Sequence, residues 1–151
     1  MNKVGSKATI IIRSTLPIGF VESMKKKYPS QEIIFVPEFL REGRALYDSI
    51  HPSRIVIGSH SKNAKIFADL LVQGAVDKNV RVIFTNSNEA ETSKLFVNSY
   101  LAMRVAFFNE LDNFAMSKNL NTKEIIKAMS LDPRVGDFYN CLLYTSPSPR
   151  D

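Results

Sequence analysis

The stretch from position 88 to 119 constrains this chain most, because it is long and contains no helix breaker. No Gly or Pro occurs between positions 75 and 132, so the sequence predicts one helix of roughly 30 residues, about 45 Å long. Asn88 and Glu91 have the spacing of a capping box, which predicts the start of the helix. Residues 101–108 are apolar nearly all round, a pattern typical of burial on more than one side.

The first half of this helix carries two polar residues that share a face. Lys94 and Asn98 are four positions apart and stand among Leu95, Phe96 and Val97. A cation and an amide on a mostly apolar helix indicate an anionic or polyhydroxyl ligand. The alternative is a solvated stripe beside the core.

Composition limits the classes of protein that fit this chain. Its 151 residues suffice for one domain or for pieces of two. No apolar run reaches membrane-spanning length and the N-terminus lacks a signal-peptide core, so we expect no membrane contact and a cytoplasmic location. One cysteine and two histidines leave no plausible metal site. The net charge of +5 suits a small anionic ligand, but the basic residues are scattered, so we expect no nucleic-acid partner.

Short β-branched runs alternate with helical patterns along the first part of the chain. Strands are predicted at residues 8–13, 33–36, 55–58 and 80–85, and helices at 20–27 and 61–75. After the long helix, Asn121 and Glu124 again have capping-box spacing and predict a helix to about residue 130. The alternation predicts an α/β fold with parallel neighbouring strands, followed by a helical extension.

Polar side chains follow the first two predicted strands. Ser14 and Thr15 come after the first strand, and Glu38 and Glu42 come after the second. Ligands of doubly wound sheets bind at the carboxyl ends of strands, so these groups would share one rim, where a carboxylate can act as a base. The alternative is that they are turn residues in contact with solvent. The six glycines form neither a G-x-G-x-x-G fingerprint nor a P-loop.

The last part of the chain holds two further candidates. Arg134, in LDPRVG, suits bidentate contact with phosphate or carboxylate, although a surface arginine is the plain alternative. Cys141 is flanked by leucines and has no histidine nearby, so we interpret it as a spectator thiol. Residues 141–151 lack periodicity and end in SPSPRD, which predicts a disordered tail.

Four motifs in order resemble the UDP-glucose/GDP-mannose dehydrogenase family, over residues 8 to 140. They are STLPIG, VPEFLREGRALYDSIHPSRIVIG, NEAETSKLFVNSYLAMRVAFFNELD and LDPRVG. Within the family, the likeness is greatest to the bacterial enzymes that act on UDP-glucose. The resemblance implies oxidation of the sugar C6 alcohol to a carboxylate by two NAD-dependent hydride transfers, giving UDP-glucuronate. A cysteine of the family carries the substrate as a thiohemiacetal and then as a thioester.

The resemblance also implies roles for residues that match the family motifs. Ser14, Thr15 and Glu42 would contact the cofactor, with Thr15 beside the nicotinamide and the reacting centre. Glu42 would hold the water that hydrolyses the thioester, and Lys94, with Asn98 beside it, would stabilise the oxyanion. The nucleotide sugar would contact the side chains of Glu38, Glu42, Lys94 and Asn98, the backbone of Phe39 and Leu40, and Arg134 from a neighbouring subunit.

The sequence departs from the family in two places. The glycine loop of the first Rossmann half is absent, and so is the glycine-rich segment that ends in the nucleophilic cysteine, so Cys141 receives no such role. We predict that residues 1–87 are the C-terminal part of an NAD-binding Rossmann-like domain and 88–140 a partial helical dimerisation domain. Residues 141–151 would be a non-native tail. This predicts an inactive fragment that forms a homodimer; the alternative is a non-catalytic helical dimerisation module.

Overall fold

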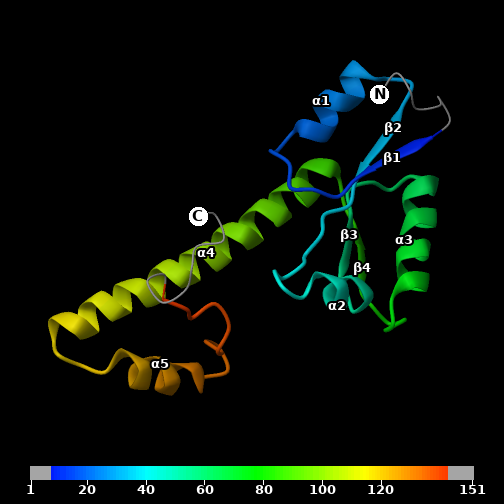
Figure 1. Ribbon diagram of the computed structural model, residues 1–151. Helices are drawn as coiled ribbons and strands as arrows, with labels where there is room; N and C mark the ends of the chain where they lie inside the picture. The colour runs from blue at the N-terminus through cyan, green and yellow to red at the C-terminus, as the bar shows by residue number, and fades with distance from the viewer. Residues whose placement is uncertain (1–7, 143–151) are drawn as a thin grey trace. The chain divides into compact units, whose positions relative to one another are not determined.

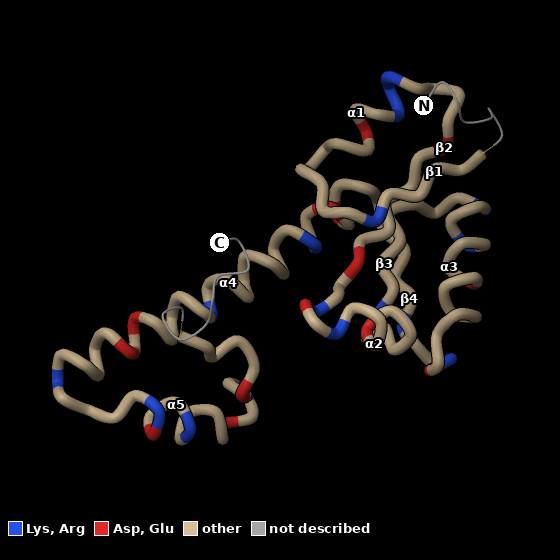
Figure 2. Tube along the Cα trace, in the orientation of Figure 1, with Lys and Arg blue, Asp and Glu red and all other residues tan. Residues whose placement is uncertain are grey.

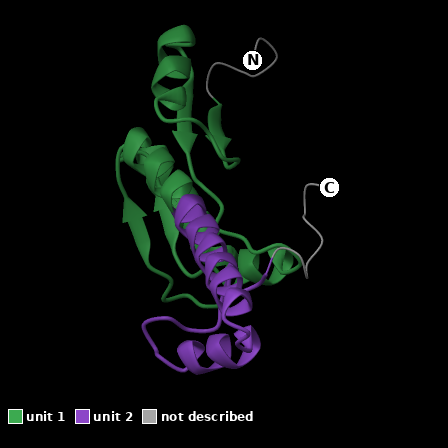
Figure 3. Ribbon diagram, turned by 90° about the vertical axis from the view of Figure 1, so that its left-hand side faces the viewer, with its two compact units in different colours: residues 1–96 green, residues 97–151 purple. Residues whose placement is uncertain are grey.

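The computed structural model describes residues 8–142 and shows an α/β arrangement in which strands and helices alternate before two final helices (Figure 1). The elements in chain order are β1 Thr9–Ile12, α1 Phe20–Lys27, β2 Glu32–Phe35, α2 Ala45–Ile50, β3 Ile55–Ile57, α3 Lys62–Gly74, β4 Val82–Phe84, α4 Ser87–Ser117 and α5 Thr122–Ser130. The chain divides into two compact units, residues 1–96 and 97–151, and α4 contributes to both (Figure 3).

All strand pairs in unit 1 are parallel, as the alternation of strands and helices predicted. β1 pairs with β2, and β3 pairs with β4. A backbone hydrogen bond of 2.8 Å, donated by Gly58 N–H to the Phe35 carbonyl, links the β2–β3 edges. At Gly58 a Cβ atom would lie 3.0 Å from that carbonyl oxygen and 3.1 Å from the Ala90 Cβ, so glycine allows α4 to pack closely here.

Side chains of β2 alternate between two apolar layers. Ile33 and Phe35 pack with Val21 of α1 and Ala90 of α4, whereas Ile34 packs in a separate cluster with α3. β2 is therefore covered on both faces, which explains why residues 33–36 are a continuous apolar run instead of an alternating polar pattern. The predicted fold class is confirmed.

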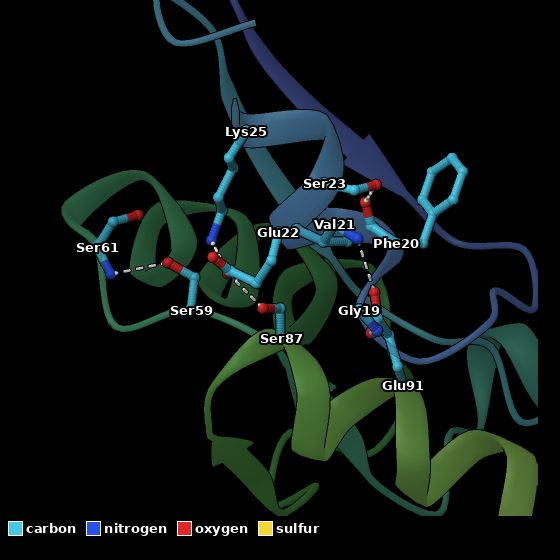
Figure 4. A network of polar contacts seen from close by, with 10 residues as sticks. All are labelled: Gly19, Phe20, Val21, Glu22, Ser23, Lys25, Ser59, Ser61, Ser87 and Glu91. Carbon is cyan, nitrogen blue, oxygen red and sulfur yellow. Dashed lines mark hydrogen bonds and ion pairs between the residues drawn. The ribbon is translucent and has the colours of Figure 1, made fainter. Parts of the chain in front are cut away.

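The start of α4 differs from the sequence prediction. The helix begins at Ser87, and Glu91 does not close a capping box with Asn88. Instead, the fully buried Glu91 carboxylate accepts hydrogen bonds from the N–H groups of Gly19 (2.5 Å) and Val21 (2.9 Å) (Figure 4). A distant partner thus replaces the local capping box, because the first N–H groups of α1 have no acceptor within their own helix and attract a carboxylate.

Unit 2 consists of the rest of α4, α5 and the segment that follows it. Arg104 of α4 donates hydrogen bonds to the carbonyls of Val135 (2.9 Å) and Phe138 (2.8 Å), which attach that segment to the helix. Leu142 is buried, so packing extends to residue 142, and the start of the predicted disordered tail at residue 141 is too early. The prediction for positions 143–151 lies outside the described residues.

One side of α4 is covered within unit 2, and another is open. Phe108 is 1% exposed, whereas Met103, Phe107 and Phe114 are 61%, 55% and 57% exposed. Burial on a second side therefore stays a prediction. The helix that follows begins as predicted, with the Asn121 side chain accepting from two backbone N–H groups at its start. Between residues 8 and 142, no helix is long and apolar enough to cross a membrane.

Candidate functional site

The loops after β1 and β2 leave the same edge of the sheet, because these strands are parallel neighbours. Ser14 and Thr15 are exposed at this edge. Glu38 is joined to the β1 loop twice: its N–H donates to the Arg13 carbonyl (3.3 Å), and its carboxylate lies 3.1 Å from Arg13 Nε. The two hydroxyls and Glu38 thus lie at one edge of the β1–β2 pair, and their roles stay predictions.

Lys94 lies beside this rim and is half-buried. Its Nζ is 5.3 Å from the centroid of the Phe39 ring, and the Arg54 guanidinium is 3.9 Å from the same centroid. Burial lowers the pKa of Lys94; the charge of Glu38 opposes this effect, and the charge of Arg54 adds to it. We call Arg13, Glu38, Phe39, Arg54 and Lys94 the rim cluster. A fixed cation in such a place can stabilise negative charge that develops on a substrate.

A small pocket of about 50 Å³ adjoins the rim cluster, and Leu40 is among its lining residues. Arg13, Glu38, Phe39 and Arg54 also line it. This volume holds a few water molecules but no sugar ring. The pocket is therefore too small to be the sugar site, and a sugar bound at the rim cluster would lie on the surface outside the pocket.

The loop that carries Glu42 is held by an ion pair between Arg41 and Asp48. Arg41 donates to the Asp48 carboxylate from its backbone N–H (2.8 Å) and from its guanidinium (2.6 Å). These hydrogen bonds lower the pKa of Asp48 to about 2. Gly43 provides the left-handed turn, with φ of 72°. Glu42 is exposed, and among residues 8–142 neither it nor Thr15 has a hydrogen bond or ion pair to the rim cluster.

Two predicted site residues belong to the second unit. Asn98 is exposed on α4, one helical turn after Lys94. Arg134 is exposed and forms a 2.6 Å ion pair with Asp132, whose carboxylate raises the pKa of Arg134. The roles of both residues stay predictions.

A polar network, buried at Glu91 and open to solvent at Glu22 and Lys25, fixes the end of the STLPIG loop to α4 (Figure 4). Beside the two hydrogen bonds to Glu91, the Ser87 hydroxyl donates to the Glu22 carboxylate (2.7 Å), which also pairs with Lys25 (2.9 Å). Both contacts lower the pKa of Glu22. Glu91 precedes Lys94 by one helical turn, so the network holds the loop after Thr15 to the part of α4 that carries the lysine.

Sequence patterns gave no indication that Arg13, Arg54 and Asp48 contribute to this region, and they indicated only a local capping role for Glu91. Arg54 stands in the quoted HPSRIVIG segment directly before a strand, which was the one available signal. Basic and acidic positions are interspersed along the elements of each unit (Figure 2). No group of three or more His, Cys, Asp or Glu side chains in the described part of the chain is placed to hold a metal ion.

Two family profiles match the chain. Residues 1–92 match the NAD binding domain of the UDP-glucose/GDP-mannose dehydrogenase family, and residues 88–147 match its central domain.

Three proteins similar to this chain are named as UDP-glucose dehydrogenases. The chain is 50% identical over 140 residues to UDP-glucose 6-dehydrogenase of Campylobacter jejuni, covering 93% of this chain and 36% of that protein. It is 48% identical to the Streptococcus pneumoniae enzyme of the same name, covering 87% and 35%. A solved UDP-glucose dehydrogenase of Pyrobaculum islandicum superposes with a TM-score of 0.75 at 32% identity, covering 87% and 32%. The chain spans about a third of these relatives, and it belongs to the UDP-glucose/GDP-mannose dehydrogenase family.

Proposed function

We propose that this chain is a segment of an NAD-dependent nucleotide-sugar dehydrogenase that oxidises UDP-glucose to UDP-glucuronate. In that enzyme it supplies part of the catalytic rim and the central helix. The observation that carries the proposal is the half-buried Lys94 beside Phe39 and Glu38, in a chain half identical to a UDP-glucose 6-dehydrogenase.

Each rim residue has a role that follows from its chemistry. Lys94 holds positive charge where negative charge develops on the C6 oxygen, which stabilises the transition state more than the ground state. Glu38 and the backbone of Phe39 and Leu40 line the substrate side. Glu42 orients the hydrolytic water, because its carboxylate is exposed and can accept a hydrogen bond from a water molecule.

The residues present fit one end of an NAD molecule. Ser14 and Thr15 expose hydroxyls at the carboxyl end of β1, where doubly wound sheets bind ligands. NAD, when bound, accepts the hydrides. The sequence contains no glycine fingerprint for the pyrophosphate, so that part of the cofactor is held by residues outside this sequence.

The proposal includes a homodimer in the cytoplasm. The open side of α4, with Met103, Phe107 and Phe114 more than half exposed, is an apolar surface of the kind that a second copy covers. Arg134, exposed at 88% of its side chain, is available to a ligand held by the partner subunit, and Asn98 adds an amide beside the sugar.

A graft tests the enzymatic proposal. Residues 8–140 replace the matching segment of the Campylobacter jejuni relative, and NADH formation is followed with UDP-glucose and NAD. The graft should be active, and Lys94→Ala should lower kcat by about 10²–10³-fold, as removal of an oxyanion-stabilising group does. Lys65→Ala, at an exposed position of α3, is the matched control and should retain normal turnover.

Two outcomes would contradict the proposal. A folded graft that forms no NADH with UDP-glucose excludes the assigned substrate. An active graft that tolerates Lys94→Ala excludes the catalytic role of that lysine. The rival proposal, a non-catalytic helical dimerisation module, is favoured by the open side of α4; it predicts that the isolated chain self-associates and that the graft lacks activity.

A further inference from the structure

One aromatic ring in unit 1 is contacted by two cations. The guanidinium carbon of Arg54 is 3.9 Å from the centroid of the Phe39 ring, and Lys94 Nζ is 5.3 Å from the same point. Both distances are within the range of attractive cation–π contact. The Phe39 ring therefore contacts both Lys94, which has a role in the proposed mechanism, and Arg54, which has none so far.

Arg54 is anchored by the sheet. It directly precedes β3, whose first residue, Ile55, is buried and donates its N–H to the Arg81 carbonyl (2.9 Å). Phe39 packs against the apolar cluster that includes Val56 of the same strand. The backbone that carries Arg54 and the Phe39 ring are thus both held by β3, and a planar guanidinium this close to a ring can restrict the ring more than a lysine can.

Lys94 has no carboxylate partner of its own within residues 8–142. Glu38, the acid whose charge acts on Lys94, is paired with Arg13 at 3.1 Å. Because no ion pair fixes the ammonium, its position depends on the packing of its stem and on the Phe39 ring.

We propose that Arg54 is a positioning residue for Lys94: its guanidinium holds the Phe39 ring against which the ammonium lies. The proposal rests on the function proposed above, because it assumes that the place of this ammonium matters to the reaction. The charge of Arg54 also lowers the pKa of Lys94, after the larger effect of burial, while Glu38 raises it. Arg54 therefore acts on both the place and the proton affinity of the amine.

The test needs no substrate. Lysines of the 151-residue chain are ¹³C-methylated and titrated by NMR, with Lys94→Arg identifying the Lys94 signal. The Lys94 amine should titrate below the ordinary range of a lysine side chain. Arg54→Ala should raise the pKa of Lys94 and shift the Phe39 ring signals. Arg54→Lys should keep the pKa low, because the charge remains, but still shift the ring signals. Arg44→Ala, at an exposed arginine, is the control and should change neither.

Unchanged Lys94 and Phe39 signals in Arg54→Ala would overturn the proposal. If that variant does not fold, Arg54→Lys decides, and unchanged ring signals in it are the overturning result. In the graft, Arg54→Ala should lower kcat about tenfold or more with little change in KM, and Arg54→Lys should recover part of the loss. An inactive graft with the expected NMR response refutes the proposed function alone, whereas an active graft without that response refutes the role of Arg54 alone.

Discussion

Replacement of Glu91 should reveal how strongly the STLPIG loop is fixed to α4. The carboxylate is fully buried and accepts two hydrogen bonds from backbone N–H groups, those of Gly19 and Val21. Each buried donor left without an acceptor destabilises the native state by about 1–3 kcal/mol. Glu91→Ala strands both donors and should therefore cost roughly 2–6 kcal/mol, a large part of the stability of an ordinary domain.

Glu91→Gln is a milder substitution than Glu91→Ala and is the better variant to measure. The amide keeps one carbonyl acceptor but presents an NH₂ group to the second backbone donor, so the expected loss is about 1–3 kcal/mol. Relief of the desolvation of a buried charge acts in the opposite direction and favours the lower end of this range. In a chain of this length the loss corresponds to a decrease of Tm by about 2–12 °C.

The assay is thermal and chemical unfolding of the full chain, with hydrogen exchange at individual amides. Exchange should accelerate at Gly19 and Val21 before the rest of α1 is affected. Glu89→Gln, an exposed acid in the first turn of the same helix, is the matched control and should stay within about 0.5 kcal/mol of the unmodified chain. Equal stability of the two Gln variants, with unchanged exchange at Gly19, would refute this reasoning.

Two further predictions follow from other contacts. Hydrogen bonds from Arg41 lower the pKa of Asp48 from its usual 3.8 to about 2, so the contribution of Asp48 to stability is present above pH 4 and is lost as the pH falls towards 2. Asp48→Asn should therefore destabilise the chain at pH 7 and should be nearly neutral at pH 2. An equal effect of the substitution on the free energy of unfolding at both pH values would contradict this. Phe107→Glu should convert a dimer into monomers in sedimentation velocity, while Asn113→Glu, an exposed polar control on α4, should not; a monomeric unmodified chain at micromolar concentration would exclude the dimer. Phe108 is unsuitable for this test because it is buried within its own chain.

The elements could be predicted because their signals are local. β-branched runs gave the strands, and the breakers Pro29 and Pro37 stand close to observed element ends. The predicted bounds of α1 match the structure residue for residue, since a helix that stops before a proline is limited by its neighbours in sequence. The placement of Glu38 beside the β1 loop also followed from the sequence, because parallel strands bring their carboxyl ends to one edge.

The contacts that hold the site together could not be predicted in the same way. Glu91 finds its donors about 70 positions earlier in the chain, and a capping-box pattern says nothing about such a partner. Arg54 carries no periodicity that would separate it from an ordinary surface arginine. The contact of its guanidinium with Phe39 depends on the path of the loop after β2, and that path is fixed by Asp48 and Arg41.

The charges of the rim cluster fit a role in binding better than a role in folding. The cluster contains three cations, Arg13, Arg54 and Lys94, and one carboxylate, that of Glu38. Lys94 is half-buried, and this burial lowers its pKa. An uncompensated cation that is withdrawn from water destabilises the folded chain. Natural sequences break such rules mainly where function requires it. An anionic ligand would neutralise the excess charge, so its binding should be strengthened by the same arrangement that weakens the unliganded fold.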